Sequence, residues 1–258
     1  MSGYNGSTPT LVTPTPDLLY QLGQRNRVIN GAFSINQRAV SGTVSVGAYT
    51  YAHDRWRGGD SGCTYTFATS ENLTTITITA GSLVQVVEGA TLQSGAHTLS
   101  WGGSVGMKIN GGAAGVSGMQ AVLTGGADCY LETVGTGTLN LVQLERGGVI
   151  TPFEFRDDEL RRCRRYYIGW SVAANKGPMS QQTESSGTGL GSSVVMQFEN
   201  PLRTTPAASG YFNASAGGSV SGAASIGGDV SPNSVRFGAT NRYAHTLDTV
   251  SIDAEIYT

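Results

Sequence analysis

The chain has 258 residues, a formal net charge of −2 and a charged fraction of only 13%. So small a net charge gives no long-range attraction to nucleic acid or to anionic lipid, and neither is an expected partner. A hydrophobic share of 39%, with 11 Tyr and 7 Phe, excludes a disordered chain, because such chains are poor in aromatic residues. No apolar run reaches the roughly 18 residues of a membrane span, and the first residues lack the basic start and apolar core of a signal peptide.

Residues 1–27 predict an extended arm that ends in a short helix. Pro9, Pro14 and Pro16 favour an extended backbone over a helix or a central strand. A helical turn over residues 18–22 can then follow, capped by the aspartate that precedes it. So short a helix is not stable alone, so we expect it to pack against its own domain or against sister subunits.

Residues 28–156 predict a β-sandwich of the jelly-roll type. Apolar and polar residues alternate along much of this stretch, for example at Cys63, Tyr65 and Phe67, and such alternation gives a strand one buried face. Clusters of Gly, Ser and Asn interrupt the pattern at intervals of roughly 10–12 residues, as in sandwiches. Further expected strands are residues 75–79, 83–87, 105–109, 120–123, 129–134 and 139–144.

Residues 157–170 predict a helix that connects two β-domains. Three acids at residues 157–159 lie in its first turn and arginines follow, an order that suits the helix dipole. Leu160, Cys163 and Tyr167 would form one buried stripe. The arginines could bind phosphate or polysaccharide, but the neighbouring acids can pair with them, and we favour this structural role.

Residues 171–258 predict a second, smaller β-domain. Residues 171–192 are rich in Gly, Ser and Gln and indicate a loop, after which short apolar segments predict strands. The apolar bulk is small, so we expect this domain to depend on packing against sister chains. The expected fold class is therefore all-β: a jelly-roll β-sandwich, a connecting helix and a second small β-domain.

Residues suited to metal or covalent chemistry are present but are not arranged for it. Cys63, Cys129 and Cys163 are widely spaced and match no metal-binding pattern, so we interpret them as buried thiols. The three histidines are isolated from one another, which argues against a histidine metal site. Residues 59–61 (Gly-Asp-Ser) resemble the nucleophile block of GDS hydrolases, but the segment at His245 (HTLD) has the required Asp-x-x-His in reverse order. We expect no enzyme activity, no catalytic residue, no metal and no cofactor.

Several motifs, in this order and at these spacings, resemble a family of phage tail proteins that contain a carbohydrate-binding-module-like jelly roll. The matching segments are residues 26–38 (NRVINGAFSINQR), 54–56 (DRW), 142–156 (VQLERGGVITPFEFR), 159–167 (ELRRCRRYY) and 201–206 (PLRTTP). Leu202 stands where this family usually has Met, a substitution that conserves volume. Within these motifs we interpret five residues as pins of strands and corners. They are Asp54, Arg55, Trp56, Phe153 and Phe155.

The resemblance implies a component of a bacteriophage virion, made in the host bacterial cytoplasm and commonly assembled as a homotrimer. It favours a tail fibre or spike subunit whose N-terminal arm binds other virion proteins. The C-terminal domain would then be outermost and would attach to a host surface glycan. The alternative is a structural virion protein that binds no receptor, such as a head decoration, a head fibre, a collar or a baseplate subunit.

Sugar-binding folds stack aromatic rings on pyranose faces and surround them with amide and hydroxyl groups. Trp101 and Trp170 are candidates by residue type, but both positions are more typical of a packed core. The polar segment at residues 241–245 lies between strands and is the better candidate. The expected sugar-binding residues are Tyr211, Asn241, Arg242, Tyr243 and His245.

Overall fold

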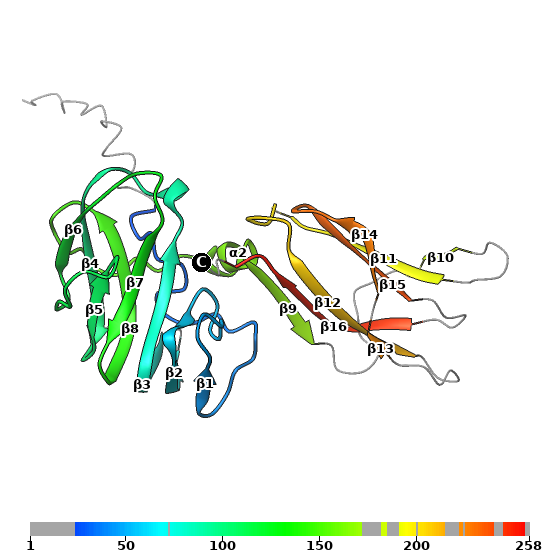
Figure 1. Cartoon of the computed structure of the whole chain (residues 1–258), viewed down its shortest axis with the longest axis horizontal. Helices are drawn as coiled ribbons and strands as arrows, with labels where there is room; N and C mark the ends of the chain where they lie inside the picture. Colours follow the sequence, from blue (N-terminus) through cyan, green and yellow to red (C-terminus); the bar gives the residue numbers. More distant parts are fainter. Residues whose placement is uncertain are drawn as a thin grey trace, which may run out of the picture.

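The computed structural model describes residues 24–71, 73–171, 182–184, 191–199, 201–214, 222–223, 225–239 and 245–255. These residues form mainly antiparallel β-sheet, with one short α-helix, α2 (Glu159–Arg164), and one 3-10 turn (Gly89–Thr91). The all-β class predicted from the sequence is therefore confirmed. Figure 1 shows the larger sheet on one side of α2 and two smaller sheets on the other. The helix expected over residues 18–22 lies outside the described residues.

The larger sheet has eight strands, and one of them belongs to two layers. Its strands are β1 (Val44–Val46), β2 (Arg57–Ser70), β3 (Leu73–Val87), β4 (Gly95–Gly103), β5 (Gly106–Ile109), β6 (Met119–Leu123), β7 (Cys129–Val134) and β8 (Gly137–Arg146). Early in β3, residues 76–78 pair with β8, whereas residues 84–87 pair with β7. Strands β8, β4 and β6 thus form one branch of the sheet, and β7 and β5 form the other.

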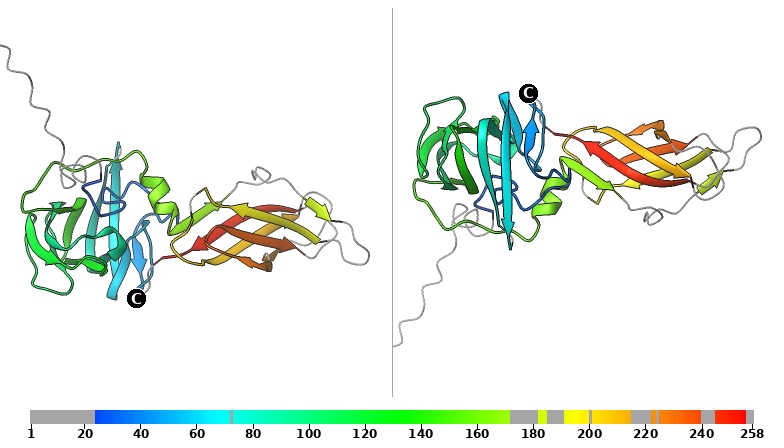
Figure 2. Two further views of the ribbon diagram at one scale, coloured as in Figure 1. Left: turned by 90° about the horizontal axis from the view of Figure 1, so that it is seen from above. Right: turned by 90° about the horizontal axis from the view of Figure 1, so that it is seen from below.

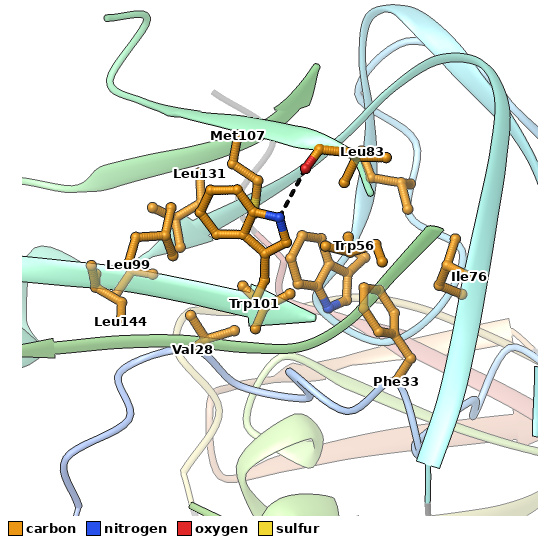
Figure 3. Packing of buried hydrophobic residues seen from close by; sticks show 14 of the residues in the cluster. Val28, Phe33, Trp56, Ile76, Leu83, Leu99, Trp101, Met107, Leu131 and Leu144 are labelled. Carbon is orange, nitrogen blue, oxygen red and sulfur yellow. Dashed lines mark hydrogen bonds between the residues drawn. The ribbon is translucent and has the colours of Figure 1, made fainter. Parts of the chain in front are cut away.

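The core lies between these two branches. Leu99 and Leu144 come from β4 and β8, Met107 and Leu131 come from β5 and β7, and all four are 0% exposed (Figure 3). Alternate residues of each strand point into this core, which explains the period-two apolar pattern of the sequence. Trp101 is buried beside them and donates a hydrogen bond from Nε1 to the carbonyl oxygen of Val105 at 2.9 Å (Figure 3).

Two segments that were expected as separate strands form the single strand β3. Between them, Gly81 has a φ of +71°, and a Cβ at this residue would lie 2.1 Å from the carbonyl oxygen of Gly62. The pairing of β2 with β3 shifts at this place between Gly58 and Cys63. The glycine-rich stretch that predicted a turn is therefore a β-bulge, which bends the ladder without ending it.

The strands beyond α2 form two four-stranded antiparallel sheets, in the orders β10-β11-β15-β14 and β13-β12-β16-β9 (Figure 2). Their bounds are β9 (Tyr167–Ser171), β10 (Gln182–Glu184), β11 (Gly191–Gln197), β12 (Ala207–Ala214), β13 (Gly222–Ala223), β14 (Ser225–Val230), β15 (Ser234–Ala239) and β16 (His245–Asp253). Among the described residues, a small buried cluster of Leu202, Val235, Ile252 and Ala254 joins the two sheets.

The connecting helix is shorter than predicted. It ends at Arg164, and Tyr167–Ser171 form strand β9, paired with β16. The carbonyl of Arg165 accepts a hydrogen bond from the Arg203 amide, and that of Tyr166 accepts one from Ala254. Tertiary partners thus satisfy backbone groups that a longer helix would have used. Of the residues predicted to form a buried stripe, Cys163 is buried (0% exposed), but Leu160 is 37% exposed.

Charged residues are buried where the larger sheet meets the smaller ones. Arg55 and Glu255 form an ion pair with side chains 1% and 0% exposed, and the Arg55 guanidinium lies 3.5 Å from the centre of the Tyr166 ring. Arg38 contacts Asp253 at 3.4 Å. Residues far apart in the sequence therefore hold the two groups of sheets together.

The structural role predicted for the motif residues is confirmed for three of them. Asp54 accepts hydrogen bonds at 2.6 Å from both the amide nitrogen and Nε2 of Gln37, Arg55 forms the buried ion pair described above, and Trp56 donates to the carbonyl oxygen of Asn30 at 3.0 Å. Phe153 and Phe155 contact each other edge to face, but Phe155 is 64% exposed. The prediction that Phe155 pins a corner is therefore wrong.

The three cysteines are buried free thiols, as predicted. Burial raises the pKa of Cys63 and of Cys129 to about 12, so both thiols stay protonated at neutral pH. Among the described residues, no helix has both the length and the apolar character needed to cross a membrane.

We expect the protein to lose stability as the pH falls from about 6.5 to 4. His53 is 1% exposed and its Nδ1 lies 2.8 Å from the Tyr65 hydroxyl; burial lowers the pKa of His53 to about 4. In this window the unfolded chain binds a proton that the folded chain does not, so unfolding becomes easier by about 3 kcal/mol. The measurement is urea denaturation from pH 8 to 4.5.

The variant His53→Gln serves as the comparison. It should lose about 3 kcal/mol less than the wild type over the same pH range. Burial raises the pKa of Asp54 and of Glu255, which acts in the opposite direction, but both carboxyls are present in both proteins and cancel in the difference. Equal pH dependence in the two proteins would contradict the prediction.

Candidate binding groove

The sugar-binding residues predicted from the sequence belong to the smaller sheets. Tyr211 lies in β12, His245 begins β16, and the two strands are paired. Asn241, Arg242 and Tyr243 lie outside the described residues, as do the side chains of Tyr211 and His245. The structure therefore brings the backbones of two of the five residues onto neighbouring strands, and their role in binding sugar stays a prediction.

The two tryptophan candidates differ in what the structure describes. Trp101 is 7% exposed and hydrogen-bonded within the core, so the core interpretation of this residue is confirmed. The backbone of Trp170 pairs with Val250 in the sheet, and its side chain lies outside the described part of the chain.

The Gly-Asp-Ser segment lies in the bulge of β2. Asp60 accepts a hydrogen bond from the hydroxyl of Tyr49 at 2.9 Å, and His53 is bonded to Tyr65. The described contacts thus give Ser61 no base of the kind that a serine nucleophile requires. Across the described part of the chain, no group of three or more His, Cys, Asp or Glu side chains is placed to hold a metal ion.

Four of the five arginines around α2 pair with carboxylates, and three of these pairs involve the neighbouring acids, as the structural interpretation predicted. In each pair the guanidinium nitrogen and the carboxylate oxygen are 2.8 to 2.9 Å apart. Three pairs lie at the helix, and the fourth connects it to the residue before the 3-10 turn. The pairs are Arg156–Glu159, Arg161–Asp158, Arg162–Asp158 and Arg165–Glu88. The basic cluster therefore helps to place α2 between the sheets.

An open groove of about 400 Å³ lies on the face of the larger sheet that points away from the core. In β7, Cys129 and Leu131 are buried in the core, so Tyr130 and Glu132 point to the opposite face. The groove is lined by Arg57, Asp60, Val84, Asn110, Gly111, Asp128, Tyr130 and Glu132.

Strand register places the lining residues in rows across four strands. Arg57 of β2 is opposite Val84 of β3, Val84 is opposite Glu132 of β7, and Glu132 is opposite Lys108 of β5. Two residues further along β3 and β7, Val86 is opposite Tyr130. Residues that are distant in sequence are thereby brought onto one surface.

Hydrogen bonds and ion pairs hold the polar side chains of the groove in place. Glu132 contacts Nζ of Lys108 at 2.8 Å and accepts a hydrogen bond from Ser82 at 2.8 Å. Asp60 accepts one from Tyr49, which raises the pKa of the tyrosine. The Arg57 guanidinium lies 4.9 Å from the centre of the Tyr49 ring. These contacts preorganise the groove, and preorganised groups lose less entropy on binding.

The turns at the edge of the groove are also fixed by side chains. Asn110 accepts a hydrogen bond from the Tyr130 amide at 2.8 Å, and its own amide donates to the Tyr130 carbonyl at 2.8 Å. Asp128 accepts one from the Gly89 amide at 2.7 Å. Tyr130 is partly buried and packs against a cluster of Val84, Val86 and Tyr166. The groove thus combines aromatic surface with carboxylate, amide and guanidinium groups.

Sequence reasoning missed this groove. The alternation in residues 129–134 correctly indicates that Tyr130 and Glu132 face away from the core. It carries no information on which strands flank β7. Asp60 was considered only as part of the Gly-Asp-Ser segment, and its place beside Tyr49 depends on the bulge in β2.

A second pocket, of about 290 Å³, lies beside α2 and the smaller sheets. Arg161 and Arg164 line it together with Ile168, Met196 and Phe198. Gln37, Gln197 and Glu199 also line it, so this pocket has two arginines and one carboxylate, whereas the groove has one arginine and three carboxylates.

Comparisons of this chain with known protein families, with curated proteins and with solved structures find no match.

Proposed function

We propose that this chain is a structural protein of a bacteriophage virion, a tail fibre or spike subunit that attaches to polysaccharide on the host surface. The sequence motifs that resemble phage tail proteins support the virion assignment. The two facing branches of the larger sheet support a jelly-roll sandwich of the carbohydrate-binding type, and the sheets beyond α2 support a second, distal domain. In this proposal the chain is a homotrimer that contacts other virion proteins through residues 1–27.

The observation that carries the proposal is the groove on the larger sheet. Sugar sites combine an aromatic surface with hydrogen-bonding groups that fix the hydroxyls of the ligand. Tyr130 supplies the aromatic surface, while Asp60, Asn110 and Glu132 supply acceptors and an amide. Tyr49 lies beside the lining and donates a hydrogen bond to Asp60. The groove is open, as binding along a long polymer requires. This assigns the glycan contact to the larger sheet as well as to the residues predicted near β16.

We expect Tyr130→Ala to weaken binding to a recognised polysaccharide about tenfold. Removal of an aromatic ring from a binding surface costs up to about 1.4 kcal/mol, which is a factor of about ten in affinity. The measurement is biolayer interferometry with the full chain and immobilised capsular and lipopolysaccharide glycans. Phe155→Ala is the matched control, because this aromatic side chain is 64% exposed and does not line the groove.

Two outcomes would count against the proposed site. Unchanged affinity of Tyr130→Ala, with circular dichroism like that of the wild type, would remove the groove from the glycan contact. Equal loss in Phe155→Ala would indicate a general effect of losing an aromatic residue. Binding that survives in the groove variant would direct attention to the residues around Tyr243.

A second candidate function is that of a virion protein that joins its neighbours without binding a receptor. Exposed apolar side chains favour it: Val116 is 82% exposed, Val122 is 84% exposed and Val149 is 74% exposed. Val122 lies on β6, the last strand of its branch of the sheet, and exposed apolar edges are typical of subunit contacts. Absence of binding to every glycan tested would favour this second function.

A further inference from the structure

We propose that the groove selects hydroxyl-rich glycans without acidic groups and rejects sugars that carry carboxylate, sulfate or phosphate. This inference rests on the proposed function, because it specifies which class of glycan the groove would hold. It is carried by the signs of the charges around the groove and by the depth at which each charge lies.

The carboxylates of the groove outnumber its cations. Asp60, Asp128 and Glu132 line it together with a single guanidinium, that of Arg57. The ammonium group of Lys108 adds one further positive charge next to the lining, but it contacts Glu132 at 2.8 Å and is balanced there. A ligand therefore meets a net negative surface, and an acidic group brought onto it would be repelled.

The difference in burial between the cation and the carboxylates makes the exposed surface of the groove still more negative. Arg57 is 3% exposed, and its guanidinium lies against the Tyr49 ring. Asp60 and Asp128 are exposed. The cation thus lies beneath the surface of the groove while two carboxylates lie on it. An acidic sugar would come close to these carboxylates before it could reach the guanidinium.

The exposed groups of the groove are mainly hydrogen-bond acceptors. A carboxylate only accepts, and each of its oxygens has two lone pairs, so Asp60 and Asp128 retain acceptor capacity besides their bonds to Tyr49 and Gly89. Neighbouring hydroxyls of a hexose can donate to one carboxylate together, in the charge-assisted bonds that are shortest and strongest. Neutral sugars provide such donors, and a protonated amino sugar adds an attractive charge.

The experiment measures the ranking of glycan classes by the full chain. Immobilised dextran and mannan represent neutral polymers, chitosan oligosaccharide represents amino-bearing ones, and polygalacturonate and hyaluronan represent acidic ones. Binding is recorded by biolayer interferometry at 20 mM and at 150 mM salt. We expect the wild type to bind neutral or amino-bearing members at least tenfold more tightly than acidic ones.

The variant that tests the cause is Asp60→Asn with Asp128→Asn. It removes two negative charges and keeps the side-chain shapes. It should therefore lower the ratio of the affinity for neutral glycans to that for acidic glycans at least tenfold, and it should weaken binding to chitosan. The matched control, Glu71→Gln with Asp157→Asn, removes two exposed negative charges away from the groove lining. The control should leave the ratio as in the wild type.

The outcomes separate this inference from the proposed function. Tightest binding of acidic glycans by the wild type, or the same ratio in the groove variant as in the control, would overturn the charge selection alone. If the affinity for acidic glycans is the same in the groove variant as in the wild type, these glycans bind outside the groove. The pocket beside α2 that Arg161 and Arg164 line would then be the site to examine. Failure of every glycan to bind would overturn the proposed function and this inference together.

Discussion

Glu255→Gln is expected to lower the free energy of unfolding by about 3–5 kcal/mol, because it leaves a buried guanidinium without its counter-charge. The Glu255 side chain is 0% exposed and pairs with Arg55, whose side chain is 1% exposed. Arg55 also donates to the carbonyl oxygen of Val86 at 2.6 Å, which holds the guanidinium in the buried position. An arginine cannot lose its proton to escape the cost.

Two further variants show whether the effect comes from the buried pair. Asp253→Asn should lose about 1 kcal/mol or less, because Asp253 is 20% exposed and contacts Arg38 at 3.4 Å. Arg55→Met combined with Glu255→Met should be more stable than Glu255→Gln, since replacement of both charges leaves neither buried alone. Guanidinium chloride denaturation followed by fluorescence provides the free energies. Wild-type stability in Glu255→Gln would show that the pair does not hold the sheets together.

The second large effect is expected from Trp56→Ala, which should destabilise the protein by about 3–5 kcal/mol. Trp56 is 0% exposed and stacks on Phe33 with ring centres 4.7 Å apart (Figure 3). Its loss leaves a cavity between the branches of the larger sheet. The loss also leaves the Asn30 carbonyl without the 3.0 Å hydrogen bond from the indole nitrogen.

A graded pair of variants checks this explanation. Trp56→Phe keeps most of the buried apolar volume but loses the hydrogen bond, so it should cost less than Trp56→Ala. Phe155→Ala removes a ring that is 64% exposed and should change stability by no more than about 0.5 kcal/mol. Urea denaturation at pH 7.5 measures all three. A cost below about 1 kcal/mol for Trp56→Ala would contradict the packing argument.

The sequence alone determined the local features of this fold. Alternation at Cys63 and Tyr65, and again at Cys129 and Leu131, indicated strands with one buried face, and each of these residues is buried. The all-β class follows from such segments. This information is available because the period of two is a local property of an extended backbone.

The length of the connecting helix was not determined locally. Residues 157–170 carry acids early and arginines late, which suits a helix, yet α2 ends at Arg164. Pairing of β9 with β16 and acceptance of hydrogen bonds from Arg203 and Ala254 decide where it ends. Such partners outweigh the modest preferences of single residues for helix.

Only the tertiary structure decided the groove and the buried ion pair. The row from Arg57 through Val84 to Glu132 exists because β2, β3 and β7 are neighbours, and Arg55 meets Glu255 across 200 positions of sequence. A strand's apolar pattern states which of its faces is buried, but several partner strands can satisfy the same pattern. The sequence therefore determined which residues of a strand face away from the core, and strand pairing determined which of them share one surface.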